Sequence, residues 1–198
     1  MITNPVIENI LTRRSVRAFT AQQLSDEELK TLLDCALYAP TGGNSQRTRF
    51  LVIQAPERLE ELNRALCTEL AARELIEGQY MNKGILAARK EGFHFFYHAP
   101  AVISAVAPRD YDNAMADCAM ALENVQLAAA ALGLGACWAN QPHWLTDVPA
   151  VRAVFQPLGL KEEEDIFGSV SVGYPARPAR TAGPRKEGRI ALDIPRML

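Results

Sequence analysis

The sequence predicts a single α+β domain in which helices flank a central, mostly antiparallel sheet. Helical patterns dominate the chain, and three or four short apolar or alternating segments lie between them as candidate strands. The 198 residues fit one domain best, and 48% hydrophobic with 22% charged residues is ordinary for a globular protein. We therefore expect residues 1–198 to form one domain, ending in an extended tail from about 175 to 198 that could pack against a second copy.

The first half of the chain carries clear helix signals. Asn4 followed by Pro5 predicts a short helix that ends near residue 12. Residues 25–28 form a capping box, and Pro40 stops the helix that this box opens. A strand is expected at residues 49–55, and a charged amphipathic helix should run from Pro56 to about residue 76.

The second half alternates buried strands with helices. Residues 100–107 and 166–174 are expected to be strands, the first because it is apolar and the second because it alternates. Residues 115–132 are apolar almost all round, which predicts the central helix. Residues 147–155 should form a shorter helix. The stretch from 133 to 138 is interpreted as a helix stop that leads into a tight passage beside something flat.

Charge and cysteine usage exclude several classes of protein. A net charge of −2 and a pI near 6.0 give no basic field for nucleic acid or an anionic membrane. The N-terminus lacks the pattern of a signal peptide, and no apolar stretch is long enough to span a bilayer. The four cysteines are scattered without a C-x-x-C pair, so we expect reduced core residues and a cytoplasmic protein.

Two polar segments offer groups for ligand binding. The run Arg13-Arg14-Ser15-Val16-Arg17 brings three guanidinium groups and a hydroxyl together just past a helix end, a combination that suits phosphate oxygens. Residues 39–46 combine two glycines with polar side chains, so a ligand could approach the backbone closely. Taken alone, the first segment fits a solvated basic turn better than a ligand site, and the second fits an ordinary helix-to-strand loop as well as a site.

Other catalytic patterns are weak. His94 and His98 have a spacing that can bind metal on a helix, but the sequence offers no third ligand nearby. We interpret residues 94–98 as an aromatic segment that covers a pocket or the core, and we expect no metal. Neither a G-x-S-x-G elbow nor a Walker loop occurs, so no catalytic side chain is assigned. Chemistry carried by an organic cofactor fits such a chain better.

Taken in order, these segments resemble the nitroreductase family of FMN enzymes. Residues 13–19 resemble the family's R-R-S-x-R-x-F opening, and residues 39–46 resemble its A-P-S-x-x-N-x-Q loop. Residues 117–138 resemble its central helix and following turn, and Gly173-Tyr174-Pro175 with a basic tail resembles its C-terminal end. The resemblance implies a layered, homodimeric nitroreductase-like fold that binds FMN.

The resemblance also implies roles for individual residues. Arg13 and Ser15 would hold the FMN phosphate, helped by Arg185 or Lys186, with Arg177, Arg180 and Arg189 as rival cations in the tail. Arg14 would lie along the ribityl chain or phosphate, and Arg17 would lie beside the N1/C2 carbonyl edge of the flavin, where reduction leaves negative charge. The remaining expected cofactor contacts are a loop from the other subunit, at Pro40, Thr41, Gly42 and Asn44, and the turn near flavin N5, at Trp138, Ala139, Asn140 and Gln141.

Two positions depart from the family pattern. Arg47-Thr48 stands where Pro-Trp is usual, which could alter packing under the flavin or the acceptor pocket. Asn140-Gln141-Pro142 stands where Gly or Glu often lies near N5, so the group that contacts N5 stays open.

The resemblance implies an FMN-dependent oxidoreductase with a ping-pong mechanism. Hydride would pass from NADH or NADPH through flavin N5 to a small oxidised acceptor such as a nitroaromatic or a quinone. The alternatives are a specialised flavin oxidase or reductase on the same fold, and a flavin-binding or ligand-sensing dimer without NAD(P)H turnover. The sequence does not distinguish NADH from NADPH and does not identify the acceptor.

Overall fold

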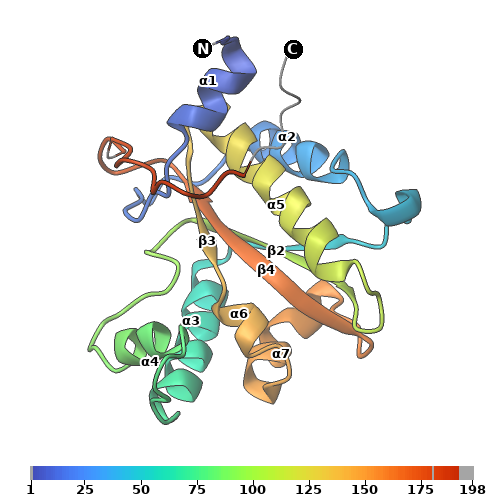
Figure 1. Cartoon of the computed structure of the whole chain (residues 1–198). Coiled ribbons are helices and arrows are strands. Elements are labelled where there is room, and N and C mark those ends of the chain that lie inside the picture. Colours follow the sequence, from blue (N-terminus) through green and yellow to red (C-terminus); the bar gives the residue numbers. More distant parts are fainter. Residues whose placement is uncertain (1, 180, 192–198) are drawn as a thin grey trace.

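A four-stranded antiparallel sheet lies between two layers of helices in the computed structural model, which describes residues 2–179 and 181–191 (Figure 1). The sheet has the order β1-β2-β4-β3. Its strands are β1 (Arg49–Ile53), β2 (Ala101–Pro108), β3 (Gly135–Ala139) and β4 (Glu164–Gly173). The predicted α+β class with an antiparallel sheet is confirmed, whereas the dimer stays a prediction.

One face of the sheet is covered by α2 (Asp26–Leu37) and α5 (Ala114–Ala131), with α1 (Pro5–Thr12) packed on α5. Leu32 and Leu122 meet Ile103 and Val170 of the sheet in one apolar core. Because α5 packs against the sheet on one side and against α2 on another, it is apolar on more than one side, as its sequence predicted. The caps are also confirmed, since the Asn4 side chain accepts from the Ile7 N–H and the capping box at residues 25–28 is formed.

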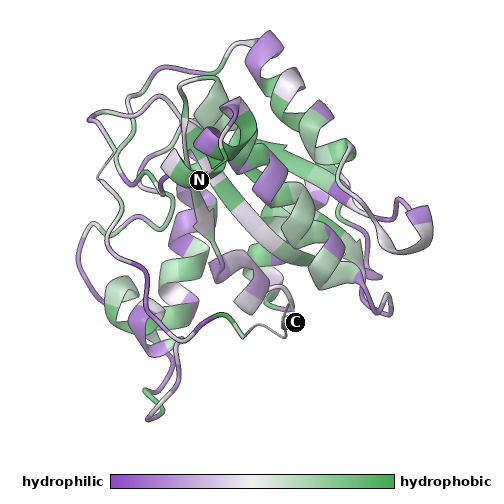
Figure 2. Ribbon diagram, turned by 45° about the horizontal axis from the view of Figure 1, so that its top comes forward, coloured by the Kyte–Doolittle hydropathy of each residue, from purple (hydrophilic) through white to green (hydrophobic). Residues whose placement is uncertain are grey.

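The opposite face is covered by four helices: α3 (Pro56–Ala71), α4 (Asn82–Ala88), α6 (Gln141–Trp144) and α7 (Pro149–Phe155). The helix α3 ends at Ala71 instead of near residue 76, because Leu70 is its last buried side chain and Leu75 and Ile76 are exposed. The short helices α4 and α6 were not predicted. Figure 2 shows the apolar sheet and inner helix faces enclosed by more hydrophilic outer surfaces.

The strand β3 was predicted only as a tight passage after the central helix. It pairs with β4 from Gly135 opposite Gly173 to Ala139 opposite Ser169. Trp138 lies over Gly168, where a Cβ atom would stand 2.5 Å from the indole ring.

Within the described residues, no helix is both long and apolar enough to cross a membrane. All four cysteines are free thiols, as predicted, and two of them, Cys118 and Cys137, are buried. The cytoplasmic location stays a prediction.

Candidate functional site

The arginine-bearing segment that follows α1 runs along the outer edge of β3. The Val16 N–H donates to the Ala136 carbonyl oxygen at 2.9 Å, and Ser15 forms a parallel bridge with Ala136. Close approach requires Gly135, because a Cβ atom there would lie 2.7 to 2.9 Å from three atoms of the Val16 side chain. The missing side chain at residue 135 therefore lets the segment seat against the sheet.

Arg13 and Arg14 each keep a buried guanidinium nitrogen without a partner. The Nη1 of Arg13 and the Nε of Arg14 are shielded from solvent, and neither finds an acceptor among the described residues. Other atoms of both side chains are held: Arg13 Nε lies 3.5 Å from Glu123, and Arg14 Nη1 donates to the Leu11 carbonyl oxygen at 2.8 Å. Buried donors are rarely left unpaired, so these two nitrogens are candidate donors to an anion such as a phosphate.

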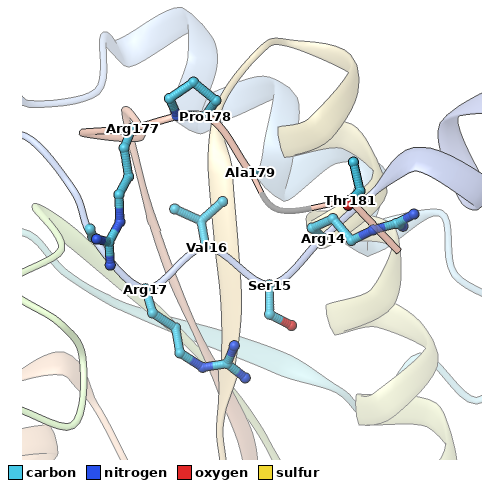
Figure 3. Close-up of a pocket in the computed structure, with 9 residues that line it drawn as sticks. Arg14, Ser15, Val16, Arg17, Arg177, Pro178, Ala179 and Thr181 are labelled. Carbon is cyan, nitrogen blue, oxygen red and sulfur yellow. The ribbon is translucent and has the colours of Figure 1, made fainter. Parts of the chain in front are cut away.

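A cavity of about 440 Å³ lies between this segment and the C-terminal tail. That volume falls within the range of small-ligand sites. In Figure 3, Ser15 and Arg17 project to the same side, and Arg177 reaches from the tail toward the segment. The lining residues are Arg14, Ser15, Val16, Arg17 and Ala18 from the segment, with Arg177, Pro178, Ala179 and Thr181 from the tail.

Among the described cations of the tail, Arg177 lines this cavity. Arg185 and Lys186, which the resemblance assigned to the phosphate, are exposed and are not among the residues that line this cavity. The rival Arg177 lines it, and Arg180 lies outside the described residues. The tail reaches the segment because Ala176 donates its N–H to the Ala18 carbonyl oxygen at 2.9 Å.

Arg17 lies at the border of a second cavity, of about 370 Å³, whose wall includes Phe19, Phe93, Tyr97 and His98. Burial alone lowers the pKa of Arg17, but the neighbouring Cys137, Tyr97 and Tyr80 together raise it by more. The guanidinium is therefore charged at any working pH. The sequence had suggested a covering role for residues 94–98 but had not singled out Tyr97.

The glycine-bearing loop is fixed by a buried carboxylate on α5. Both Asp117 carboxylate oxygens accept from the Gly42 N–H at 3.2 Å, and Tyr111 donates its hydroxyl to the same carboxylate at 2.7 Å. Asn44 and Gly43 adopt positive φ angles of 53° and 59°, which glycine and asparagine tolerate best. Pro40, Thr41, Gly42 and Asn44 line neither arginine-bearing cavity of this chain, and Figure 1 places their loop on the other side of α5.

The turn predicted near the flavin N5 atom forms the end of β3 and the start of α6. The Trp138 Nε1–H donates to the Asn140 Oδ1 at 3.0 Å, which fixes the turn. Ala139 is buried against the second core, while Asn140 and Gln141 are half-buried. The arginine segment bridges to Ala136 of β3, and the turn follows the end of the same strand, so β3 connects the two.

Glu60 joins the two histidines of the aromatic segment, so a third potential metal ligand exists that the sequence had not indicated. His94 Nε2 lies 3.3 Å from Glu60 Oε1, and His98 Nδ1 lies 3.8 Å from it. However, His94 Nδ1 accepts the Phe96 N–H at 3.1 Å, which leaves the ring proton on Nε2, facing Glu60. In metal sites the nitrogen away from the metal normally donates a hydrogen bond, so this arrangement favours a proton over a metal.

Comparisons with known proteins agree on one family. The Nitroreductase family model matches residues 10–174. A nitroreductase with bound FMN from Bacteroides fragilis has a TM-score of 0.87 and 32% identity, covering 97% of this chain and 100% of that one. Another with bound FMN, from Desulfitobacterium hafniense, has a TM-score of 0.82 and 25% identity, with coverages of 97% and 100%. An Archaeoglobus fulgidus protein named for NADH dehydrogenase or NAD(P)H nitroreductase activity is 30% identical over 173 residues, 85% of this chain and 84% of its own length. The chain belongs to the nitroreductase family.

Proposed function

We propose that the chain binds FMN between the N-terminal arginines and the tail and acts as an NAD(P)H-dependent oxidoreductase on a small oxidised acceptor. The observation that carries the proposal is the pair of buried, unpartnered guanidinium nitrogens on Arg13 and Arg14. Two FMN-bound relatives share this fold over nearly the whole chain, which supports the same cofactor here.

The phosphate end of the ligand would lie against Arg13, Arg14 and the Ser15 hydroxyl. Guanidinium nitrogens that already lie unpaired can donate to phosphate oxygens without first breaking a protein hydrogen bond. Arg177 is the tail cation that the cavity geometry favours, in place of Arg185 or Lys186. The two unpaired nitrogens and the lining cations thus fit a dianionic phosphate.

The ring end would lie along β3, between Arg17 and the turn at residues 138–141. When bound, FMN would supply the chemistry of hydride transfer between NAD(P)H and the acceptor, in a ping-pong cycle. Arg17 contributes a permanent positive charge beside the N1/C2 carbonyl edge, where negative charge develops on reduction. No side chain is assigned as an acid or base, so the protein contributes position and electrostatics.

A second copy of the chain would complete the site. Leu37 and Tyr38 at the end of α2 are 64% and 89% exposed, and Val6, Ile10 and Leu11 of α1 are exposed as well. Exposed apolar clusters of this kind favour association. In a two-fold dimer, the loop at residues 40–44 of one copy would reach the arginines of the other.

Anaerobic stopped-flow spectroscopy tests the activity. The protein loaded with FMN is mixed with NADH or NADPH, and the visible flavin absorbance is followed. We expect one nicotinamide to bleach the flavin, and a nitroaromatic or a quinone to restore the absorbance in a second mix. If neither nicotinamide bleaches the bound flavin, the chain is a flavin-binding or ligand-sensing protein instead. Rapid reoxidation by only one specialised acceptor would favour a dedicated reductase.

A further inference from the structure

The turn that carries Tyr97 adopts a costly backbone conformation. Tyr97 and the next residue, His98, both have φ angles of 56°, in the left-handed region. Neither is a glycine, and a bulky side chain in this region crowds the following carbonyl group. Two such residues in succession persist only where the surrounding structure imposes them, and such conformations concentrate at functional sites.

Three hydrogen bonds from buried polar groups impose this turn. The Phe95 N–H donates to Asn63 Oδ1 at 2.9 Å, and Asn63 Nδ2 donates to the Phe93 carbonyl oxygen at 3.1 Å. His94 Nδ1 accepts the Phe96 N–H at 3.1 Å. Asn63 and His94 are both buried, and the Phe96 side chain is fully enclosed, so the turn is anchored on its inner side.

The outer side of the turn presents the Tyr97 ring to Arg17. Both side chains line the cavity of about 370 Å³, so the Tyr97 phenol and the Arg17 guanidinium face a common space. Burial is the main cause that raises the pKa of Tyr97, and Cys137 adds to it, so the phenol stays protonated at neutral pH. A neutral hydroxyl can accept from the guanidinium without cancelling its charge.

We propose that Tyr97 is a positioning residue for Arg17, held by the strained turn so that the guanidinium keeps one orientation toward the flavin. A free arginine side chain has many rotamers and loses that freedom when it engages a charge. A side chain that is already oriented loses less, and it can therefore stabilise the reduced ring more than the oxidised one. The inference rests on the proposed function, because it gives Arg17 a flavin to face.

The Tyr97→Phe variant tests this role, because it keeps the ring and removes only the hydroxyl. We expect oxidised FMN to bind nearly as in the wild type, while affinity for reduced FMN falls about tenfold. For a two-electron couple this lowers the midpoint potential by about 30 mV. The matched control is Tyr174→Phe, which removes the hydroxyl of a side chain that donates to Glu28 at 2.7 Å and lines neither arginine-bearing cavity. Its potential should equal that of the wild type.

A second readout needs no flavin. In protein without FMN, the Arg17 Nε–H signal in a nitrogen-proton NMR spectrum, assigned with Arg17→Lys, should exchange faster with solvent in Tyr97→Phe. An unchanged exchange rate would overturn the proposal. A yellow wild type whose potential does not move in Tyr97→Phe would overturn it as well and leave the proposed function intact. A wild type that binds no FMN would instead remove the proposed function, and the inference with it.

Discussion

Replacing Arg13 with glutamine should weaken FMN binding without unfolding the chain. The Arg13 Nη1 is buried without a partner, and its Nε is held 3.5 Å from Glu123, so the group is oriented before the ligand arrives. One hydrogen bond to a charged partner contributes about 1.5–3 kcal/mol. At about 1.4 kcal/mol per factor of ten, the dissociation constant should rise by about 10- to 150-fold in Arg13→Gln.

Titration of flavin-free protein with FMN, followed by quenching of flavin fluorescence, gives the affinity. Arg64→Gln is the matched control, because it removes the same charge from an exposed position on α3. The control should bind FMN like the wild type, and urea unfolding should show that both variants are folded. Equal affinities for Arg13→Gln and the control would refute the assignment of Arg13 to the phosphate.

Three further predictions follow from the site and its supports. Burial, followed by the charge of His98, lowers the pKa of His94 to about 4 from 6.5. The unfolded chain therefore takes up a proton below pH 6.5 that the folded chain resists, so the free energy of unfolding falls as the pH drops from 6.5 to 4. This loss is about 1.4 kcal/mol per pH unit. Urea unfolding at pH 7.5 and 4.5 should therefore show a loss that is about 3 kcal/mol smaller in His94→Asn than in the wild type. Gly135→Ala should destabilise the chain by about 1–3 kcal/mol and weaken FMN binding, because the added methyl group displaces Val16. A second change, Val16→Ala, should restore both the stability, measured by melting, and the FMN affinity, measured by titration. Chains with Arg13→Gln and chains with Asn44→Asp can be mixed so that half of the dimers contain one of each. If each site takes Arg13 and Asn44 from different copies, one of the two sites in a mixed dimer is intact, and a titration should recover about a quarter of the FMN sites. If both residues come from one copy, no site should be recovered.

Local signals in the sequence were enough for most of the fold. The Asn4 cap, the Ser25 capping box and the apolar α5 helix depend on neighbours within a few residues, and all three were predicted. The end of α3 depended on burial, because Leu75 and Ile76 are apolar but exposed. The strand β3 has only five residues, and its pairing with β4 across the sheet defines it.

The site shows the same division between local and distant information. The arginine run could be found because its cations are adjacent in sequence. Glu60 and Tyr97 could not be assigned, because each meets its partner only after the chain has folded: Glu60 meets His94 from α3, and Tyr97 meets Arg17 from a strained turn. The proposed role of Arg177 in place of Arg185 or Lys186 likewise depends on how the tail pairs with Ala18.

The most direct measurement is the identity and amount of any chromophore released from the purified protein. Heat-denatured protein is filtered, and the filtrate is analysed by mass spectrometry and by absorbance. The account predicts FMN at about one molecule per chain, either as purified or after incubation with FMN and gel filtration. A filtrate without flavin, together with no fluorescence quenching when FMN is added to the protein, would contradict it.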